Sequence, residues 1–195
     1  MTKHSGGCFM KIGLYGGTFD PIHHGHLIQA RDAVETLGLD ELLLIPNAIS
    51  PHKLATTPTP AEIRAEMVAA AIEGEPCFRL ERCEINRPGT SYAIDTVLEL
   101  RERYPAGTRF FYLIGQDNLA ELHTWREIER LKQLVNFVVL SRSEFRTPSP
   151  FPTLERCIDI SATEIRKRVA NGQSIRYLVP EKVHDLIQRH QLYRS

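Results

Sequence analysis

The sequence predicts an α/β fold: a single Rossmann-like domain whose doubly wound parallel sheet of about five to six strands has helices on both faces. Two observations predict it. Nearly continuous apolar runs, typical of strands buried on both faces, alternate along the chain with helical patterns. The 195 residues, 42% of them hydrophobic, are enough for one core and leave little for a second. In such a sheet, ligands bind at the carboxyl ends of the strands.

The expected strands are short runs, and most of them are apolar throughout. They are Lys11–Tyr15, Glu41–Ile45, Phe78–Ile85, Arg109–Ile114 and Phe137–Leu140.

Helices are expected between these strands. After the first strand, Leu27, Ala30, Val34 and Leu37 fall on one helical face, and Gly38 stands where a helix ends. Three segments match the capping-box pattern of a helix start: Thr59–Glu62, Thr124–Glu127 and Ser161–Glu164. Segments rich in proline, serine and threonine predict surface loops at Ile49–Pro60 and Ser143–Pro152.

Composition limits the class of partner. Lys and Arg together number 24, as do Asp and Glu, so no overall basic field indicates nucleic acid or an anionic membrane as the main partner. No apolar run approaches a bilayer span, and the four cysteines form no C-x-x-C pair, which favours a cytoplasmic location. Residues 1–9 have no apolar pattern; we expect a disordered extension there and the domain over residues 10–195.

The segment "GGTFDPIHHGH", residues 16–26, follows the first strand. We expect Gly16 and Gly17 to turn the chain into a helix that starts near residues 23–26, where free backbone N–H groups and the helix dipole favour a phosphate. His23 and His26 would share one side of the first helical turn. Two other interpretations are a plain turn with a capping histidine, and a zinc site, for which the sequence offers no complete ligand set.

Two later segments are compatible with a nucleotide. In "ISATEIRKR", residues 160–168, Ser161 at a helix start, Thr163 and Arg166 could converge on an anion. In "IGQDN", residues 114–118, Gly115 and Asp117 follow a strand, and the acid could hold ribose hydroxyls or cap a helix. The P-loop and G-x-G-x-x-G patterns are absent, which argues against a kinase or a dehydrogenase.

The segments "GGTFDPIHHGH" and "ISATEIR" together resemble the nucleotidylyltransferase superfamily, with its T/H-x-G-H and I-S-S/A-T-x-I-R signatures. With "IPNAISPHK", "PGTSYAIDTV", "FFYLIGQDNL" and "TWREIERL", residues 10–193 resemble the bacterial nicotinate-nucleotide adenylyltransferases. The resemblance implies adenylyl transfer from ATP to nicotinate mononucleotide, with Mg²⁺ on the ATP phosphates and no metal ligands assigned to the protein.

The resemblance also implies roles for individual residues. Catalytic roles fall to His23, His26, Lys53 and Arg166. ATP contacts fall to Gly16, Gly17, Thr18, Phe19, His23, His26, Gly115, Asp117, Ser161, Thr163 and Arg166. Acceptor contacts fall to Asn47, Lys53, Ala93, Trp125 and Arg126.

One position departs from the family pattern: Ala93 replaces the threonine of its "SYT" segment. The family uses the backbone N–H there, so the contact with the substrate carboxylate should persist. Trp125 would stack on the pyridine ring, although the only tryptophan could also anchor a core.

Other functions stay open from the sequence. The acceptor could be nicotinamide mononucleotide or phosphopantetheine, or the chain could be a non-catalytic adenine-nucleotide sensor. A homo-oligomer is compatible with the sequence.

Overall fold

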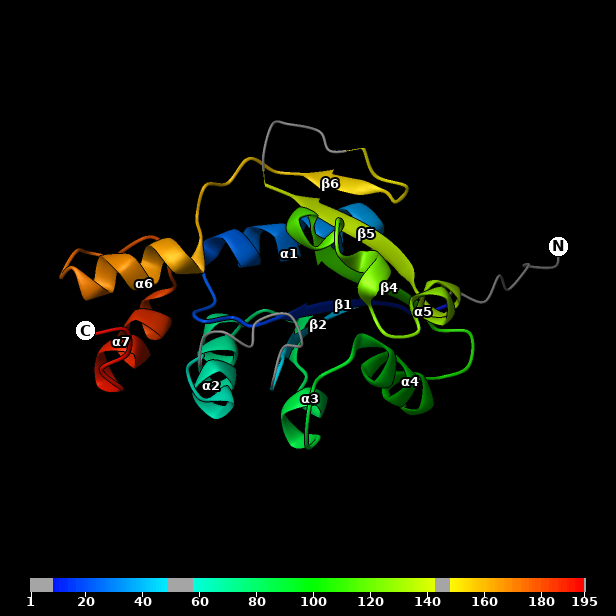
Figure 1. The fold of residues 1–195 in the computed structure, drawn as a ribbon, viewed down its shortest axis with the longest axis horizontal. Helices are drawn as coiled ribbons and strands as arrows, with labels where there is room; N and C mark the ends of the chain where they lie inside the picture. Colours follow the sequence, from blue (N-terminus) through cyan, green and yellow to red (C-terminus); the bar gives the residue numbers. More distant parts are fainter. Residues whose placement is uncertain (1–8, 49–57, 143–147, 195) are drawn as a thin grey trace, which may run out of the picture.

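The computed structural model describes residues 9–48, 58–142 and 148–194, and its centre is a six-stranded sheet (Figure 1). Every pairing in the sheet is parallel, and the spatial order is β3-β2-β1-β4-β5-β6. The strands are β1 (Lys11–Gly17), β2 (Glu41–Pro46), β3 (Phe78–Leu80), β4 (Arg109–Gly115), β5 (Asn136–Ser141) and β6 (Thr153–Glu155). This order is that of the doubly wound dinucleotide-binding fold, which confirms the predicted fold class.

Helices cover both faces of the sheet. They are α1 (His24–Leu37), α2 (Ala61–Ala71), α3 (Cys83–Asn86), α4 (Ala93–Arg103), α5 (Ile128–Leu134), α6 (Ala162–Ala170) and α7 (Glu181–Arg189), with the 3₁₀ turns η1 (Gln116–Asn118) and η2 (Leu122–Thr124). One apolar core joins the sheet to α1, α2, α6 and α7, and a second joins it to α3, α4 and α5. Figure 1 shows α6 and α7 together at one end of the molecule. No helix in the described part of the chain is long and apolar enough to cross a membrane.

Alternate residues along each strand belong to the two cores. On β2, Leu42 and Leu44 face the first core, whereas Leu43 and Ile45 face the second, and all four side chains are at most 2% exposed. This burial on both faces explains why the strand reads as an uninterrupted apolar run.

Several expected elements differ in the structure. The strand expected over Phe78–Ile85 ends at Leu80, and Cys83–Asn86 form a short helix instead. The strand β6 was not predicted, because its three residues are only partly buried and carry no apolar run.

Two of the three predicted capping boxes are wrong. Helix α2 begins after Pro60, while the backbone N–H of Thr59 donates to Asp20. The Thr124 hydroxyl donates to the carbonyl of Glu121 at 2.7 Å and closes η2, so α5 starts only at Ile128. At the third predicted position Ser161 does cap α6, because its Oγ accepts a hydrogen bond from the backbone N–H of Glu164 at 3.2 Å.

The first helix ends as predicted. Gly38 has φ 60° and ψ 52°, a left-handed conformation that favours glycine, and its N–H bonds to the carbonyl of Val34.

Residues 1–8 lie outside the described part, so the expectation of a disordered extension is untested for them. Phe9 is described, with 62% of its surface exposed. Its ring lies against Gly107, where an added Cβ would come within 2.7 Å of it, so Phe9 contacts the domain.

Candidate active site

The strand order reverses between β1 and β4, and the carboxyl ends of these two strands form the floor of the candidate site. Open α/β sheets place ligands at this switch point. Two adjoining cavities lie here, of about 860 Å³ and about 370 Å³. The residues common to the walls of both are Gly16, Gly17, Thr18, Asn47 and Asn118.

Gly16 and Gly17 are required for the space that their missing side chains leave, and they do not form the turn. Gly16 and Gly17 are the last residues of β1, and the residue in the left-handed region is Phe19, at φ 49°. A Cβ on Gly17 would lie 2.9 Å from the Phe19 ring, and one on Gly16 would lie 3.2 Å from the hydroxyl of Tyr112. The pair therefore lets side chains from the turn and from β4 close over β1.

His23 and His26 lie together at the start of α1, as predicted. Their rings stack, with centroids 3.7 Å apart and planes at 25°. The backbone N–H of His23 donates to His26 Nδ1 at 3.3 Å. Gly25 makes room for the pair, because a Cβ there would lie 3.0 Å from His23 Nδ1.

His23 is fully buried, and both of its ring nitrogens lack a hydrogen-bond partner among the described residues. Burial lowers the pKa of His23 to about 3, and the positive charges of Arg142 and His24 act in the same direction. The ring is therefore neutral at pH 7. An orphaned buried nitrogen on a cavity wall is a group that a bound ligand would satisfy.

Helix α6 brings the second predicted motif to the first. Arg166 Nη1 donates to the backbone carbonyl of Asp20 at 2.7 Å, and Nη2 donates to Thr163 Oγ1 at 3.3 Å. Ser161, Thr163 and Arg166 line the larger cavity together with His23 and His26. Gly115 and Asp117, which flank the start of η1, line the same cavity.

The smaller cavity contains most of the residues predicted to hold the acceptor. Ala93 is the first residue of α4, so its backbone N–H lies at a helix amino end. Trp125 is half-buried and meets Tyr112 edge to face, with ring centroids 5.8 Å apart. The Arg126 guanidinium lies 4.9 Å from the Tyr92 ring centroid and 3.7 Å from the Asp95 carboxylate. Asn47 lines the same cavity, and Lys53 lies outside the described residues.

Several residues of these walls and their supports were not predicted, among them the four named next. Arg142 and Tyr193 line the larger cavity, and Glu84 lines the smaller. Arg64 is fully buried beneath both and donates to the carbonyl of Thr18. Only Arg64 left a signal, since it falls on the same helical face as Met67 and Val68, where a solvated arginine would not lie.

The turn after β1 is tied to distant parts of the chain through Asp20. The Tyr193 hydroxyl donates to Asp20 Oδ1 at 2.6 Å, and the backbone N–H of Thr59 donates to Oδ2 at 3.2 Å. Burial and the nearby Asp20 carboxylate raise the pKa of Tyr193, so its hydroxyl keeps its proton. The last described residues of the chain thus brace the turn that carries the histidines.

The fold and the site define a nucleotidyltransferase enzyme of the α/β class, and residues 14–168 match the family model described as cytidylyltransferase-like. The chain is 39% identical over 188 residues to the nicotinate-nucleotide adenylyltransferase of Bacillus subtilis, covering 95% of this chain and 99% of that one. It is 43% identical to a Lactiplantibacillus plantarum protein named "Probable nicotinate-nucleotide adenylyltransferase", covering 95% and 89%. The chain belongs to the nicotinate-nucleotide adenylyltransferase family.

A solved structure supports the fold. The Plasmodium falciparum nicotinic acid mononucleotide adenylyltransferase complexed with NaAD superposes with a TM-score of 0.79 at 20% identity, covering 94% of this chain and 97% of that one.

Proposed function

We propose that this enzyme transfers the adenylyl group of ATP to nicotinate mononucleotide, giving nicotinate adenine dinucleotide and pyrophosphate, a step of NAD biosynthesis. A 5′-phosphate oxygen of the mononucleotide forms a bond to the α-phosphorus of ATP, and the bond from that phosphorus to the bridging oxygen breaks. The observation that carries the proposal is the pair of cavities that share a wall at the switch point. One site for each substrate would place the reacting groups at that wall.

ATP would occupy the larger cavity. Its phosphates would accept hydrogen bonds from His23, from His26 and from the start of α6, and Arg166 would supply a fixed positive charge. Because His23 is neutral, it would act as a hydrogen-bond donor whose strength does not vary near pH 7. Gly115 and Asp117 would lie beside the adenylate.

The chain needs no nucleophile of its own, because the attacking phosphate is already an anion. Catalysis would consist of alignment and of stabilising charge on the moving phosphoryl group. His23, His26 and Arg166 would do this, with Lys53 as a further cation.

Mg²⁺ would enter on the phosphates of ATP. Among the described residues no three His, Cys, Asp or Glu side chains are grouped to hold a metal ion. The chemistry of Mg²⁺ fits this arrangement, since it usually keeps several waters and binds substrate phosphates rather than an all-protein cage. When bound, it would screen the phosphate charges.

The mononucleotide would occupy the smaller cavity, with its pyridine ring on Trp125. Its carboxylate would accept hydrogen bonds from backbone N–H groups near Ala93 and Arg126. A carboxamide would turn its NH₂ donor toward one of these donors, and an unpaired buried group costs about 1–3 kcal/mol. We therefore expect the acid to be preferred over the amide by at least about tenfold in kcat/KM.

The test is pyrophosphate release with ATP and three acceptors: nicotinate mononucleotide, nicotinamide mononucleotide and phosphopantetheine. Nicotinate mononucleotide should be the best. Trp125→Ala should weaken both pyridine substrates, by about 1–3 kcal/mol if base stacking is the measure. Equal rates with the acid and the amide would contradict the carboxylate pocket, and no release with any acceptor would favour a nucleotide sensor. The predicted cytoplasmic location suits these substrates.

A further inference from the structure

One acidic side chain in the smaller cavity has no part in the function proposed so far. Glu84, on the short helix α3, is 5% exposed and forms part of the cavity wall. The Thr96 hydroxyl donates to Glu84 Oε1 at 2.8 Å. The Ser91 side chain also bonds to the carboxylate, and Ser91 Oγ in turn accepts from the backbone N–H of Ala48 at 3.1 Å. The carboxylate is therefore held by two hydroxyl groups, one of which is itself fixed by the backbone of Ala48.

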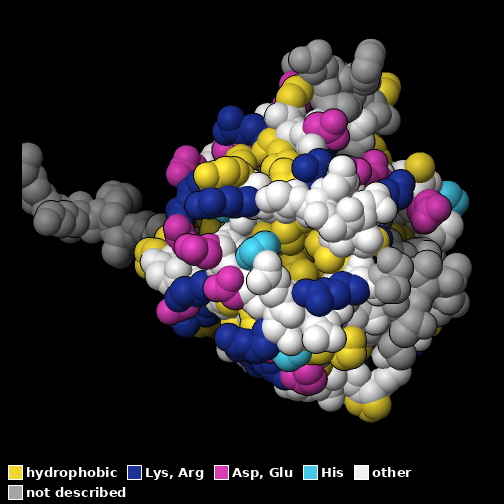
Figure 2. Space-filling view, turned by 90° about the vertical axis from the view of Figure 1, so that its left-hand side faces the viewer, with side chains coloured by type: hydrophobic (Ala, Val, Ile, Leu, Met, Phe, Trp, Pro, Cys, Tyr) yellow, Lys and Arg dark blue, Asp and Glu magenta, His cyan; other side chains and the backbone are white. Residues whose placement is uncertain are grey.

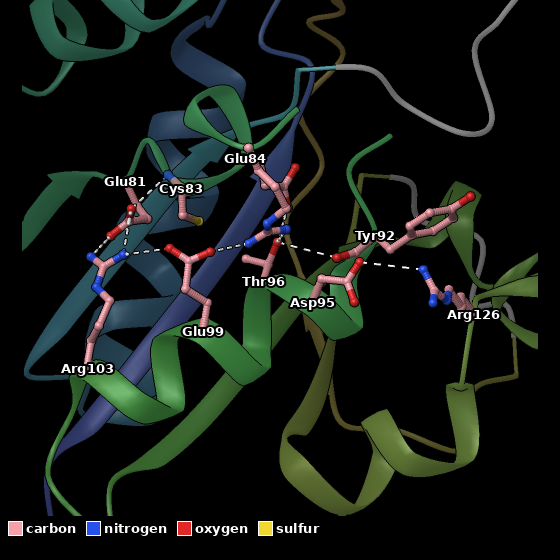
Figure 3. Close-up of polar contacts among 10 residues, drawn as sticks. Glu81, Cys83, Glu84, Tyr92, Asp95, Thr96, Glu99, Arg103 and Arg126 are labelled. Carbon is pink, nitrogen blue, oxygen red and sulfur yellow. Dashed lines mark hydrogen bonds and ion pairs between the residues drawn. The ribbon is translucent and has the colours of Figure 1, made fainter. Parts of the chain in front are cut away.

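Glu84 is the end member of a chain of charged contacts (Figure 3). Glu81 pairs with Arg103, Arg103 with Glu99, and Glu99 with Arg87, which reaches Thr96 and so Glu84. Acidic and basic groups alternate along this chain, and three carboxylates face two guanidinium groups. Each arginine bonds directly to carboxylates other than Glu84, so among the described residues Glu84 has no ion pair of its own and meets the charge of Arg87 across Thr96.

Three aromatic side chains share the cavity wall with Glu84. Tyr92, Tyr112 and Trp125 line it, and Trp125 meets Tyr112 edge to face. Aromatic faces together with a carboxylate form the kind of site that attracts an organic cation. The Arg126 guanidinium already lies over the Tyr92 ring.

The substrate in the proposed function contains such a cation. The ring nitrogen of nicotinate mononucleotide is bonded to ribose, which makes the ring a pyridinium with a fixed positive charge. We propose that Glu84 is a specificity-determining residue that provides the negative counter-charge for this cationic ring, so that the site selects pyridinium over neutral aromatic mononucleotides. This inference rests on the proposed function.

The protonation state of Glu84 would depend on whether a cationic ring occupies the cavity. Burial raises the pKa of Glu84, against the hydrogen bonds from Thr96 and Ser91 and the charge of Arg87. A cationic ring in the cavity would lower that pKa again, because an opposite charge favours the ionised form. Ligand and carboxylate would thus stabilise each other's charge.

The test compares nicotinate mononucleotide with its neutral isostere, 3-carboxyphenyl C-riboside 5′-phosphate. The isostere keeps the carboxylate, the ribose and the phosphate, and it replaces the ring nitrogen by carbon. Steady-state kcat/KM for both is measured by pyrophosphate release at equal ATP. Dissociation constants for both are measured by quenching of Trp125 fluorescence. The wild-type enzyme should prefer the cationic ring by at least about tenfold.

Two variants assign the preference to one side chain. In Glu84→Gln the preference should fall toward one, chiefly through loss of activity with nicotinate mononucleotide. Glu99→Gln is the matched control: Glu99 belongs to the same chain of contacts but does not line the cavity, so the preference should persist.

Two results would overturn the inference. They are equal kcat/KM for the two compounds in the wild-type enzyme, and an unchanged preference in Glu84→Gln, whether both compounds lose activity equally or neither does. An equal loss would indicate instead that Glu84 binds ribose or only supports the fold. If Glu84→Gln does not fold, the wild-type comparison still decides whether the ring charge is recognised, and equal values there reject the inference. Failure of the proposed function is distinguishable, since nicotinate mononucleotide itself would then not react.

Discussion

Replacing Arg64 by methionine should both destabilise the protein and weaken its affinity for ATP. The Arg64 guanidinium is fully buried, and it donates to the carbonyls of Thr59, Thr18 and Asn47 at 2.8, 2.6 and 2.7 Å. These carbonyls belong to the turn after β1, the end of β2 and the start of α2. Methionine fills much of the same volume but has no donor.

The expected loss in the free energy of unfolding follows from these three hydrogen bonds. Each carbonyl left without a donor costs about 1–3 kcal/mol if water does not reach it. Removing a buried charge returns several kcal/mol of desolvation, and burial indeed lowers the pKa of Arg64. The net loss in the free energy of unfolding should be about 2–4 kcal/mol. Because the Thr18 carbonyl lies in the turn proposed to contact the ATP phosphates, the KM for ATP should rise as well.

The assay is urea denaturation at pH 7 together with the KM for ATP. Arg82→Met is the matched control, since Arg82 is partly exposed and pairs with Glu62 at the surface, where a salt bridge contributes about 0–1 kcal/mol. If Arg64→Met lost no more stability than Arg82→Met, the view that Arg64 holds the turn would be refuted.

Three further predictions concern the larger cavity. His26→Ala should lower kcat by roughly 10²–10³ without unfolding the protein, and a near-normal kcat would exclude His26 from the transition state. Because the pKa of His23 is about 3 in the fold and near 6.5 in the unfolded chain, only the unfolded state binds the proton between these values. Stability should therefore fall by about 1 kcal/mol from pH 6.5 to 5.5 and stay level above pH 7; His23→Gln should reduce this slope in urea titrations, and an unchanged slope would mean that His23 is not the group responsible. Tyr193→Phe, which removes the 2.6 Å bond to Asp20, should raise the KM for ATP by about 3–10-fold and leave the acceptor KM unchanged. Tyr104→Phe removes an equally short bond to a carboxylate outside both cavities, and an equal rise in that variant would count against a specific brace.

The sequence predicts the sheet well because burial on both faces leaves a plain pattern. Strands such as Glu41–Pro46 are apolar at nearly every position. The position of His23 and His26 at the start of α1 is also predictable, because glycine and histidine side by side are rarely required by packing. Short elements are not: the four residues of α3 offer no period, and "RCEIN" reads equally well as the end of a strand.

Capping motifs fail for a physical reason. Thr59 and Thr124 match the pattern. In the structure the backbone N–H of Thr59 bonds to Asp20, and the hydroxyl of Thr124 bonds to the carbonyl of Glu121, so neither group is used in a capping box.

The roles of Glu84 and Tyr193 could not be found from the sequence. The contacts of Glu84 with Thr96 and Ser91 follow no periodic pattern, and the partner of Tyr193, Asp20, is far away along the chain.

The position of β1 in the middle of the sheet affects how the chain must be made. β2 follows β1 closely in the sequence, but the strand on the other edge of β1 is β4, whose Arg109 pairs with Lys11 and is synthesised much later. Until then the nascent half-sheet exposes a row of unpaired backbone groups and an apolar face, which is an aggregation hazard. Both cavities have β1 on one side and residues after β4 on the other. A fragment that ends before β4 can therefore carry the histidine motif and still have no place to bind either substrate.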